Sequence, residues 1–342
     1  MSPARSPLPA LLAPLAGLAL LTLLAALAAL APAHRALTTA LTPALTLHPA
    51  HALTPSAPAL PAALTAALTA APHAPPTRVW ALGDSRAEAR GLGPSARWPE
   101  LRRAALSRRP ALMLHLGDWV RDGHSGEEWR RALGALPPGL PLLTTRGNHD
   151  RGAWWARLGL DGLGAGAASP LRAAHLGAAL VYLLDSEGDE AATRAAVEAH
   201  AAWRAARPRP APLVLLATHR PLWSRGPHGD DERGWGAWLA PALDALGVDL
   251  LLAGHDHDYE RMAPTPGGVT CVVSGGAGTW RAPLPGLSRR PDRPDRPASL
   301  VFSARPHSLS LEVRASSLTL EAWATPREGV SELIDSVVVE GR

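Results

Sequence analysis

Five apolar runs of this sequence each end in side chains that can bind a metal ion or transfer a proton. They lead into Asp84, Asp118, Asn148 with His149, His219, and His255 with His257. Carboxylate, amide and imidazole groups are oxygen and nitrogen donors, and a pair of divalent metals needs such a set with one bridging carboxylate. The set has no thiolate, which excludes a cysteine-type zinc site. One Gly-Asp turn would carry little weight, but five such ends in one region indicate a metal centre.

The segments around these ends have the pattern of an α/β domain. The runs expected to form strands are VWALGD, ALMLHLGD, LPLLTTRGNHD, ALVYLLDS, LVLLATH, VDLLLAGHDH and VTCVVSGGAG. Helix-like segments such as WPELRRAALSRR and EAATRAAVEAHAAWRAA lie between them. In α/β sheets ligands bind at the carboxyl ends of the strands, so this order predicts that the polar ends meet in one site.

The N-terminal part of the chain has a different composition. Residues 1–33 contain Arg5 and then an uncharged, leucine-rich stretch, and Ala31-Pro32-Ala33 is a small-x-small cleavage site. The stretch is also near the lower limit for a membrane span, so a cleaved signal peptide and an uncleaved membrane anchor both stay open. Residues 34–76 repeat Ala-Leu-Thr between prolines, which is typical of a low-complexity tether.

This organisation predicts a folded domain over residues 77–342 that is exported. The location would be periplasmic, extracellular or membrane-anchored with the domain facing outward. All 34 basic side chains are arginine, but the net charge is only +4 and no basic stripe is interleaved with aromatics. The composition therefore argues against nucleic-acid binding. A single cysteine, Cys271, excludes an internal disulfide framework and reads as a small hydrophobe in a strand.

The order Gly-Asp, Gly-Asp, Gly-Asn-His-Asp, His, Gly-His-x-His resembles that of the calcineurin-like metallophosphoesterase superfamily. THRPLWS, VDLLLAGHDHDYERMAP, VSGGAG and ELIDSVVV are similar to the text of its purple-acid-phosphatase-like branch. The resemblance covers about Arg78 to the end of the chain. It implies a four-layer αββα sandwich, α/β in class, with two metal ions at the strand ends between two sheets. Iron, zinc and manganese all tolerate this ligand set.

The resemblance also implies a role for each matching residue. Asp118 would bridge the metals, Asp84 and His257 would hold the first, and Asn148, His219 and His255 would hold the second. His149 would bind the phosphate and protonate the leaving oxygen, with Asp150 orienting it. A histidine suits this transfer because it titrates near neutral pH.

Two departures from the family pattern concern the first metal. Many members have Asp-x-His in the first motif, where this chain has Asp84-Ser85-Arg86. Purple acid phosphatases place a tyrosine where this chain has Arg121, and neither Tyr182 nor Tyr259 takes that position, so we expect no tyrosinate. Arg86 would either reach the substrate phosphate through paired hydrogen bonds or form a surface salt bridge.

The function favoured by these residues is that of an exported metal-dependent phosphoesterase. It would hydrolyse phosphate monoesters by in-line attack of a metal-bound hydroxide, because two cations neutralise phosphate charge and lower the pKa of bound water. His228, in the loop RGPHGDD, would contact substrate or lie in a solvated loop. A phosphodiesterase of the same superfamily stays open. So does a catalytically weak tethered module that binds phosphorylated ligands.

Overall fold

The computed structural model describes residues 76–87, 92–158, 160, 170–206, 213–278, 291, 293–325 and 331–342. The expected leader at residues 1–33 and tether at residues 34–76 lie outside the described residues, apart from Pro76. Among the helices that the structure describes, none has the length and apolar character needed to span a membrane.

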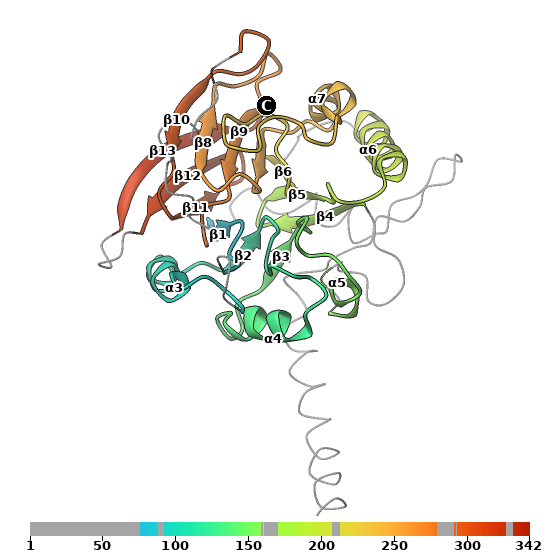
Figure 1. The fold of residues 1–342 in the computed structure, drawn as a ribbon. Helices are drawn as coiled ribbons and strands as arrows, with labels where there is room; N and C mark the ends of the chain where they lie inside the picture. The colour runs from blue at the N-terminus through green and yellow to red at the C-terminus, as the bar shows by residue number, and fades with distance from the viewer. Residues whose placement is uncertain are drawn as a thin grey trace, which may run out of the picture. The chain divides into compact units, whose positions relative to one another are not determined.

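Two mixed β-sheets form the body of the domain (Figure 1). The first has the order β13-β12-β11-β1-β2-β3 and the second β10-β8-β9-β7-β6-β5-β4. The first sheet consists of β1 (Thr77–Leu82), β2 (Leu112–His115), β3 (Leu142–Thr144), β11 (His307–Val313), β12 (Ser317–Ala324) and β13 (Glu332–Glu340). The second consists of β4 (Leu171–Leu176), β5 (Ala179–Leu184), β6 (Val214–Ala217), β7 (Leu250–Ala253), β8 (Tyr259–Met262), β9 (Thr270–Ser274) and β10 (Ser299–Ser303).

Parallel pairing brings the polar strand ends to the same edge of each sheet. Strands β1, β2 and β3 are parallel neighbours, and so are β5, β6, β7 and β9. All the runs that the sequence predicts as strands form strands. The C-terminal strands complete the first sheet, because β11 pairs antiparallel with β1 from Thr77 opposite Val313.

Helices accompany both sheets on their outer sides (Figure 1). Those near β1, β2 and β3 are α3 (Trp98–Ser107), α4 (Gly126–Gly134) and α5 (Trp154–Arg157), and those near β4, β5 and β6 are α6 (Glu190–Ala205) and α7 (Gly236–Ala245). Ser125 caps α4 and Asp189 caps α6, each accepting a backbone N–H of the first turn. The expected α/β sandwich of two sheets and outer helices is confirmed.

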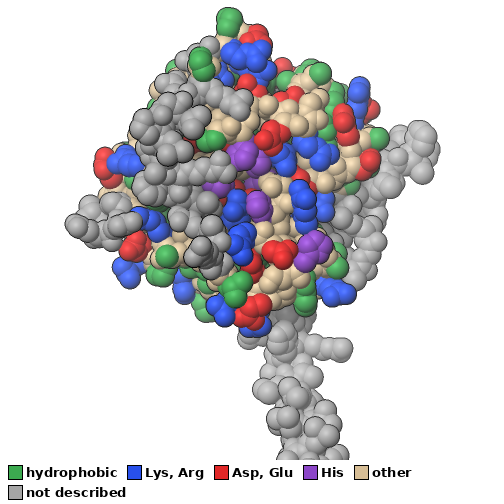
Figure 2. All heavy atoms as spheres, viewed as in Figure 1, with side chains coloured by type: hydrophobic (Ala, Val, Ile, Leu, Met, Phe, Trp, Pro, Cys, Tyr) green, Lys and Arg blue, Asp and Glu red, His purple; other side chains and the backbone are tan. Residues whose placement is uncertain are grey.

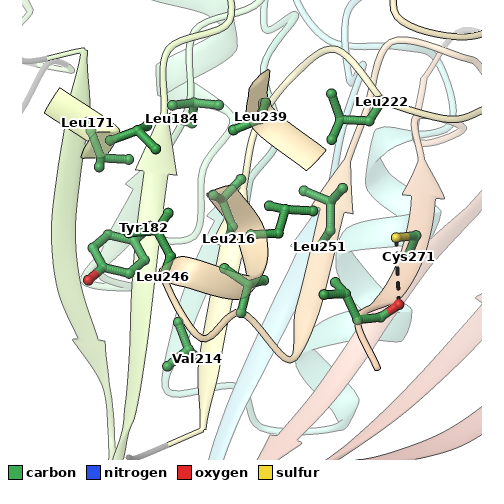
Figure 3. Packing of buried hydrophobic residues seen from close by; sticks show 14 of the residues in the cluster. Leu171, Tyr182, Leu184, Val214, Leu216, Leu222, Leu239, Leu246, Leu251 and Cys271 are labelled. Atoms are coloured by element: carbon green, nitrogen blue, oxygen red, sulfur yellow. Dashed lines mark hydrogen bonds between the residues drawn. The ribbon is translucent and has the colours of Figure 1, made fainter. Parts of the chain in front are cut away.

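The alternation of side chains along β1 shows how the layers are held. Trp80 and Leu82 are buried in a cluster with Trp98 and Leu101 of α3, whereas Ala81 is buried on the opposite face of the strand. A second cluster joins the other sheet to α6 and α7 (Figure 3), and it includes Tyr182, Leu216, Leu239, Leu251 and Cys271. Both outer interfaces are therefore packed, so the strand ends between them are set on a rigid frame.

Candidate metal centre

Three of the expected ligands have a left-handed backbone, with φ of 59° at Asp84, 60° at Asp118 and 70° at His255. Residues with a Cβ seldom adopt this region, and such strain concentrates at functional sites. Each of the three follows a glycine that lies one or two residues beyond the end of a strand. At Gly117, which has φ 89°, an added Cβ would lie 2.8 Å from His219 Nδ1. The recurring Gly-Asp and Gly-His pairs thus let the chain turn sharply while other ligands approach its backbone.

The expected second metal position has an arrangement of acceptors that calls for a cation. His219 Nδ1 lies 2.8 Å from the carbonyl oxygen of Leu116, so Nδ1 carries the proton and Nε2 presents a lone pair. That Nε2 is 3.0 Å from Asn148 Oδ1 and 3.5 Å from Asp118 Oδ1. Three electron-pair donors converge there, and a bound metal ion would satisfy all of them. The residues present fit a metal at this position.

The expected first metal position is different, because a guanidinium lies within it. Asp84 Oδ1 is buried without a hydrogen-bond partner and is 3.5 Å from His257 Nε2, while Oδ2 accepts the backbone N–H of His255. Arg86 Nε lies 3.1 Å from Asp118 Oδ2, and its Nη2 lies 3.4 Å from His257 Nε2. Arg86 therefore contacts two of the three residues expected to bind this metal. The Arg86 side chain is therefore largely buried within the centre and does not lie on the surface.

A second group of donors adjoins the centre around His255. His228, Glu232 and His255 have possible ligand atoms within 4.8 Å of one another, as do Asp84, Asp118 and His219. The rings of His228 and His255 are 4.3 Å apart, and His255 Nε2 lies 2.8 Å from Glu232 Oε2. Arg220 Nη1 is 3.2 Å from the same nitrogen. The structure thus places His228 beside His255, and its contact with substrate stays a prediction.

Sequence analysis missed Glu232 and Arg220. Arg220 follows His219 directly, and Glu232 stands four residues after His228 in the same acidic loop, so their positions were the available signals. Histidine, arginine and acidic side chains gather on this face of the molecule (Figure 2). This face therefore has cationic side chains that could bind an anion and acidic side chains that could bind a cation.

The electrostatics of the buried carboxyl groups also favour a bound cation. Burial, and then the negative charge of Asp118, raises the pKa of Asp84 well above its usual value. Burial would raise the pKa of Asp118 as well, but the neighbouring His219 imidazole and then the Arg86 guanidinium hold it below its usual value. A metal ion beside Asp84 would favour its ionised form, because an opposite charge offsets desolvation.

The structure gives Asp150 other partners than the expected His149. Its carboxylate accepts backbone N–H groups of Gly147, Asp118 and Trp119 at 2.8–2.9 Å. His149 instead directs Nδ1 at the carbonyl oxygen of Arg121, 2.8 Å away. A fully buried carboxylate needs such donors, and here they come from two loops that carry ligands. Asp150 therefore holds the loops together, and a backbone carbonyl orients the imidazole of His149.

Both tyrosines lie away from the centre. Tyr259 donates to Asp335 at 2.6 Å, and Tyr182 packs edge-on against His200. That neither tyrosine takes part in metal binding stays a prediction. Arg146, before the Gly-Asn-His-Asp turn, forms a salt bridge of 2.8 Å with Asp185.

Comparison with known proteins agrees with this geometry. Residues 77–259 match the model of a family described as calcineurin-like phosphoesterase. No curated protein matches the chain. Among solved structures, GAP50, the anchor in the inner membrane complex of Plasmodium, is 17% identical with a TM-score of 0.60, covering 79% of this chain and 90% of that one.

Two further structures have the same fold at low identity. Purple acid phosphatase PPD1 from yellow lupin (Lupinus luteus) seeds is 19% identical with a TM-score of 0.60, and the match covers 78% of this chain but 54% of that one. PhoD is 11% identical with a TM-score of 0.52, covering 78% of this chain and 70% of that chain.

Proposed function

This chain belongs to the calcineurin-like phosphoesterase family, and we propose that it is an exported, metal-dependent phosphomonoesterase. The observation that carries the proposal is the convergence of lone pairs from His219, Asn148 and Asp118 on one position. Acceptors that face one another repel without a cation between them, which supports a bound metal at this position.

Four side chains would hold the metal at that position. They are Asp118, Asn148, His219 and His255, the last through Nδ1, because its Nε2 contacts Glu232 and Arg220. When bound, the metal supplies Lewis acidity toward phosphate and water. The N–H of His149 donates to Asp118 Oδ1 at 2.9 Å, and Leu116 orients His219, so the ligands are themselves positioned by backbone groups.

His149 is the proposed general acid. Because its Nδ1 is bonded to the Arg121 carbonyl, which can only accept, Nε2 is the atom whose proton moves. In the protonated imidazole, Nε2 would donate to the leaving oxygen of the ester and leave the ring neutral. The His149 backbone N–H is bonded to Asp118, which keeps this ring beside the metal ligands.

Cationic groups on both sides of the metal ligands support a doubly charged substrate. Arg86 contacts Asp118 and His257, while Arg220 contacts His255 and forms salt bridges with Glu187 and Glu232. A phosphate monoester carries more negative charge near neutral pH than a diester does, so this arrangement favours the monoester. His228, whose ring lies tilted against that of His255, would approach the same phosphate.

The test is a comparison of 4-nitrophenyl phosphate with bis(4-nitrophenyl) phosphate on protein loaded with manganese or zinc. We expect kcat/KM to be at least about tenfold higher for the monoester. His219→Ala should lose both bound metal and turnover. His200→Gln, which removes a buried imidazole in α6, is the matched control and should retain both. A higher kcat/KM for the diester would identify a phosphodiesterase instead.

One observation favours a second candidate, a catalytically weak module that binds phosphorylated ligands. Arg86 lies among residues that would otherwise hold a metal, which lowers the charge available for catalysis. A binding module would take up a phosphomonoester in calorimetry with no release of phosphate from the metal-loaded protein. Turnover that disappears in His149→Asn would exclude it.

Export is proposed from the sequence of residues 1–33, whose apolar stretch suits a signal peptide or membrane anchor. Mass spectrometry of the mature N-terminus and fractionation of the producing cells would distinguish the two. Cleavage after Ala33 indicates a signal peptide, and an intact N-terminus in the membrane fraction indicates an anchor. Intact protein in the cytosolic fraction would overturn the proposal of export.

A further inference from the structure

The guanidinium of Arg86 already forms bonds to the first-metal residues. Its Nε bonds to Asp118 Oδ2 and its Nη2 lies by His257 Nε2, at 3.1 and 3.4 Å, and its side chain is only 11% exposed. A metal ion would need the same carboxylate oxygen and the same imidazole lone pair at about 2.0–2.2 Å. A nitrogen lone pair can accept a hydrogen bond or bind a metal, but not both at once.

The backbone fixes Arg86 at this place. Ser95 donates its N–H to the carbonyl oxygen of Ser85 and Ala87 donates to that of Gly93, both at 2.9 Å, so Arg86 lies between two cross-chain hydrogen bonds. The Ser85 hydroxyl is itself bonded to a buried histidine of β2. These hydrogen bonds fix the backbone on both sides of Arg86, and its guanidinium reaches the centre from this fixed segment.

We propose that this centre holds one metal ion, at Asp118, Asn148, His219 and His255, and that the Arg86 guanidinium takes the place of the other. An arginine keeps its positive charge at every pH a protein tolerates, so the substitute cation is permanent. It supplies one positive charge where a metal would supply two or three. Its planar N–H groups can also bond to phosphate oxygens. The inference rests on the proposed metal-dependent function.

Metal stoichiometry tests this without relying on activity. Protein loaded with manganese and freed of excess metal should contain one ion per chain by elemental analysis. Its electron paramagnetic resonance spectrum should be that of an isolated Mn²⁺ ion. Arg86→His removes the guanidinium and supplies an imidazole, so it should bind two ions and show exchange coupling between them. Arg130→His, on the exposed side of α4, is the matched control and should keep one ion.

Two other variants keep the proposal testable if Arg86→His does not fold. In a one-metal centre, Asp84→Asn retains the single ion and His219→Ala loses it. In a two-metal centre, Asp84→Asn would lower the content from two ions to one. Arg86→Gln keeps hydrogen-bond donors but removes the positive charge. Its metal content is a second measurement of the stoichiometry without the guanidinium.

The possible results separate this inference from the proposed function. Two ions in the unaltered protein would overturn the inference and leave the metal-dependent phosphoesterase intact. One ion in both the unaltered protein and a folded Arg86→His variant would also overturn it, because the arginine would not be what excludes the metal. No ion in the unaltered protein under any loading condition would overturn the proposed function itself.

Discussion

The carboxylate of Asp150 accepts the backbone N–H of Asp118 at 2.8 Å through Oδ2. The same oxygen accepts the N–H of Gly147, and Oδ1 accepts that of Trp119. One buried side chain thus joins the turn after β2 to the turn after β3, and each turn carries an expected metal ligand. Burial and the charge of Asp118 raise the pKa of Asp150 well above its usual value, and the hydrogen bonds from the backbone N–H groups oppose this shift.

Asp150→Ala should destabilise the protein and weaken metal binding. Several buried N–H groups would lose their acceptor, at a cost of about 1–3 kcal/mol for each one left unsatisfied. Chemical unfolding of the metal-free protein measures the loss, and metal titration measures the weaker affinity. If Asp150 instead acted through His149, Asp150→Asn would keep metal affinity but shift the pH profile of kcat. We expect that profile to keep its shape.

His149→Asn should lower kcat by roughly a hundredfold and leave metal content unchanged. The backbone N–H that bonds to Asp118 stays in place, so only the proton donor is removed. The loss should be smaller for 4-nitrophenyl phosphate than for an alkyl phosphate, because a good leaving group needs little protonation. A variant that lost metal in proportion to activity would show that His149 is a ligand.

Tyr259→Phe should lower the free energy of unfolding but leave the colour of the iron-loaded protein unchanged. The hydroxyl bonds to Asp335, and that bond contributes about 1 kcal/mol to the free energy of unfolding. Arg261 still pairs with Asp335 at 2.6 Å, which limits the loss. Visible absorption is the measurement. A strong band in the green-to-red region that vanished in this variant would mean that the tyrosine reaches the metal.

His307 should make stability depend on pH. Burial lowers its pKa to about 4, and its neutral ring accepts from Ser274 at Nε2 while Nδ1 donates to the Arg305 carbonyl. An unfolded histidine titrates near 6.5, so the contribution is complete above that pH and is lost as pH falls toward 4. The difference is on the order of 3 kcal/mol.

A His307→Gln variant isolates that contribution. Its stability should fall less steeply than that of the unaltered protein between pH 6.5 and 4. Urea unfolding of both metal-free proteins across this window gives the two slopes. Burial also lowers the pKa of His200 to about 4. His200 is present in both proteins, so its contribution to the pH dependence cancels in the difference. Parallel slopes would refute the assignment.

The sequence by itself determined the fold class, the strands that carry the site and the identity of the candidate ligands. Strands such as β6 and β7 are short, apolar and followed by histidine or Gly-His, and such local patterns survive folding because they suit a buried parallel sheet.

Tertiary structure alone decided what Arg86, Asp150 and Glu232 do. Their partners are remote in sequence, as with Arg86 and His257, which are 171 residues apart. From its residue type alone, Arg86 could form a surface salt bridge or contact phosphate. In the same way, Asp150 could pair with a histidine. The choice depends on which groups the two packed sheets bring within hydrogen-bond distance, because buried charges must find partners wherever the fold supplies them.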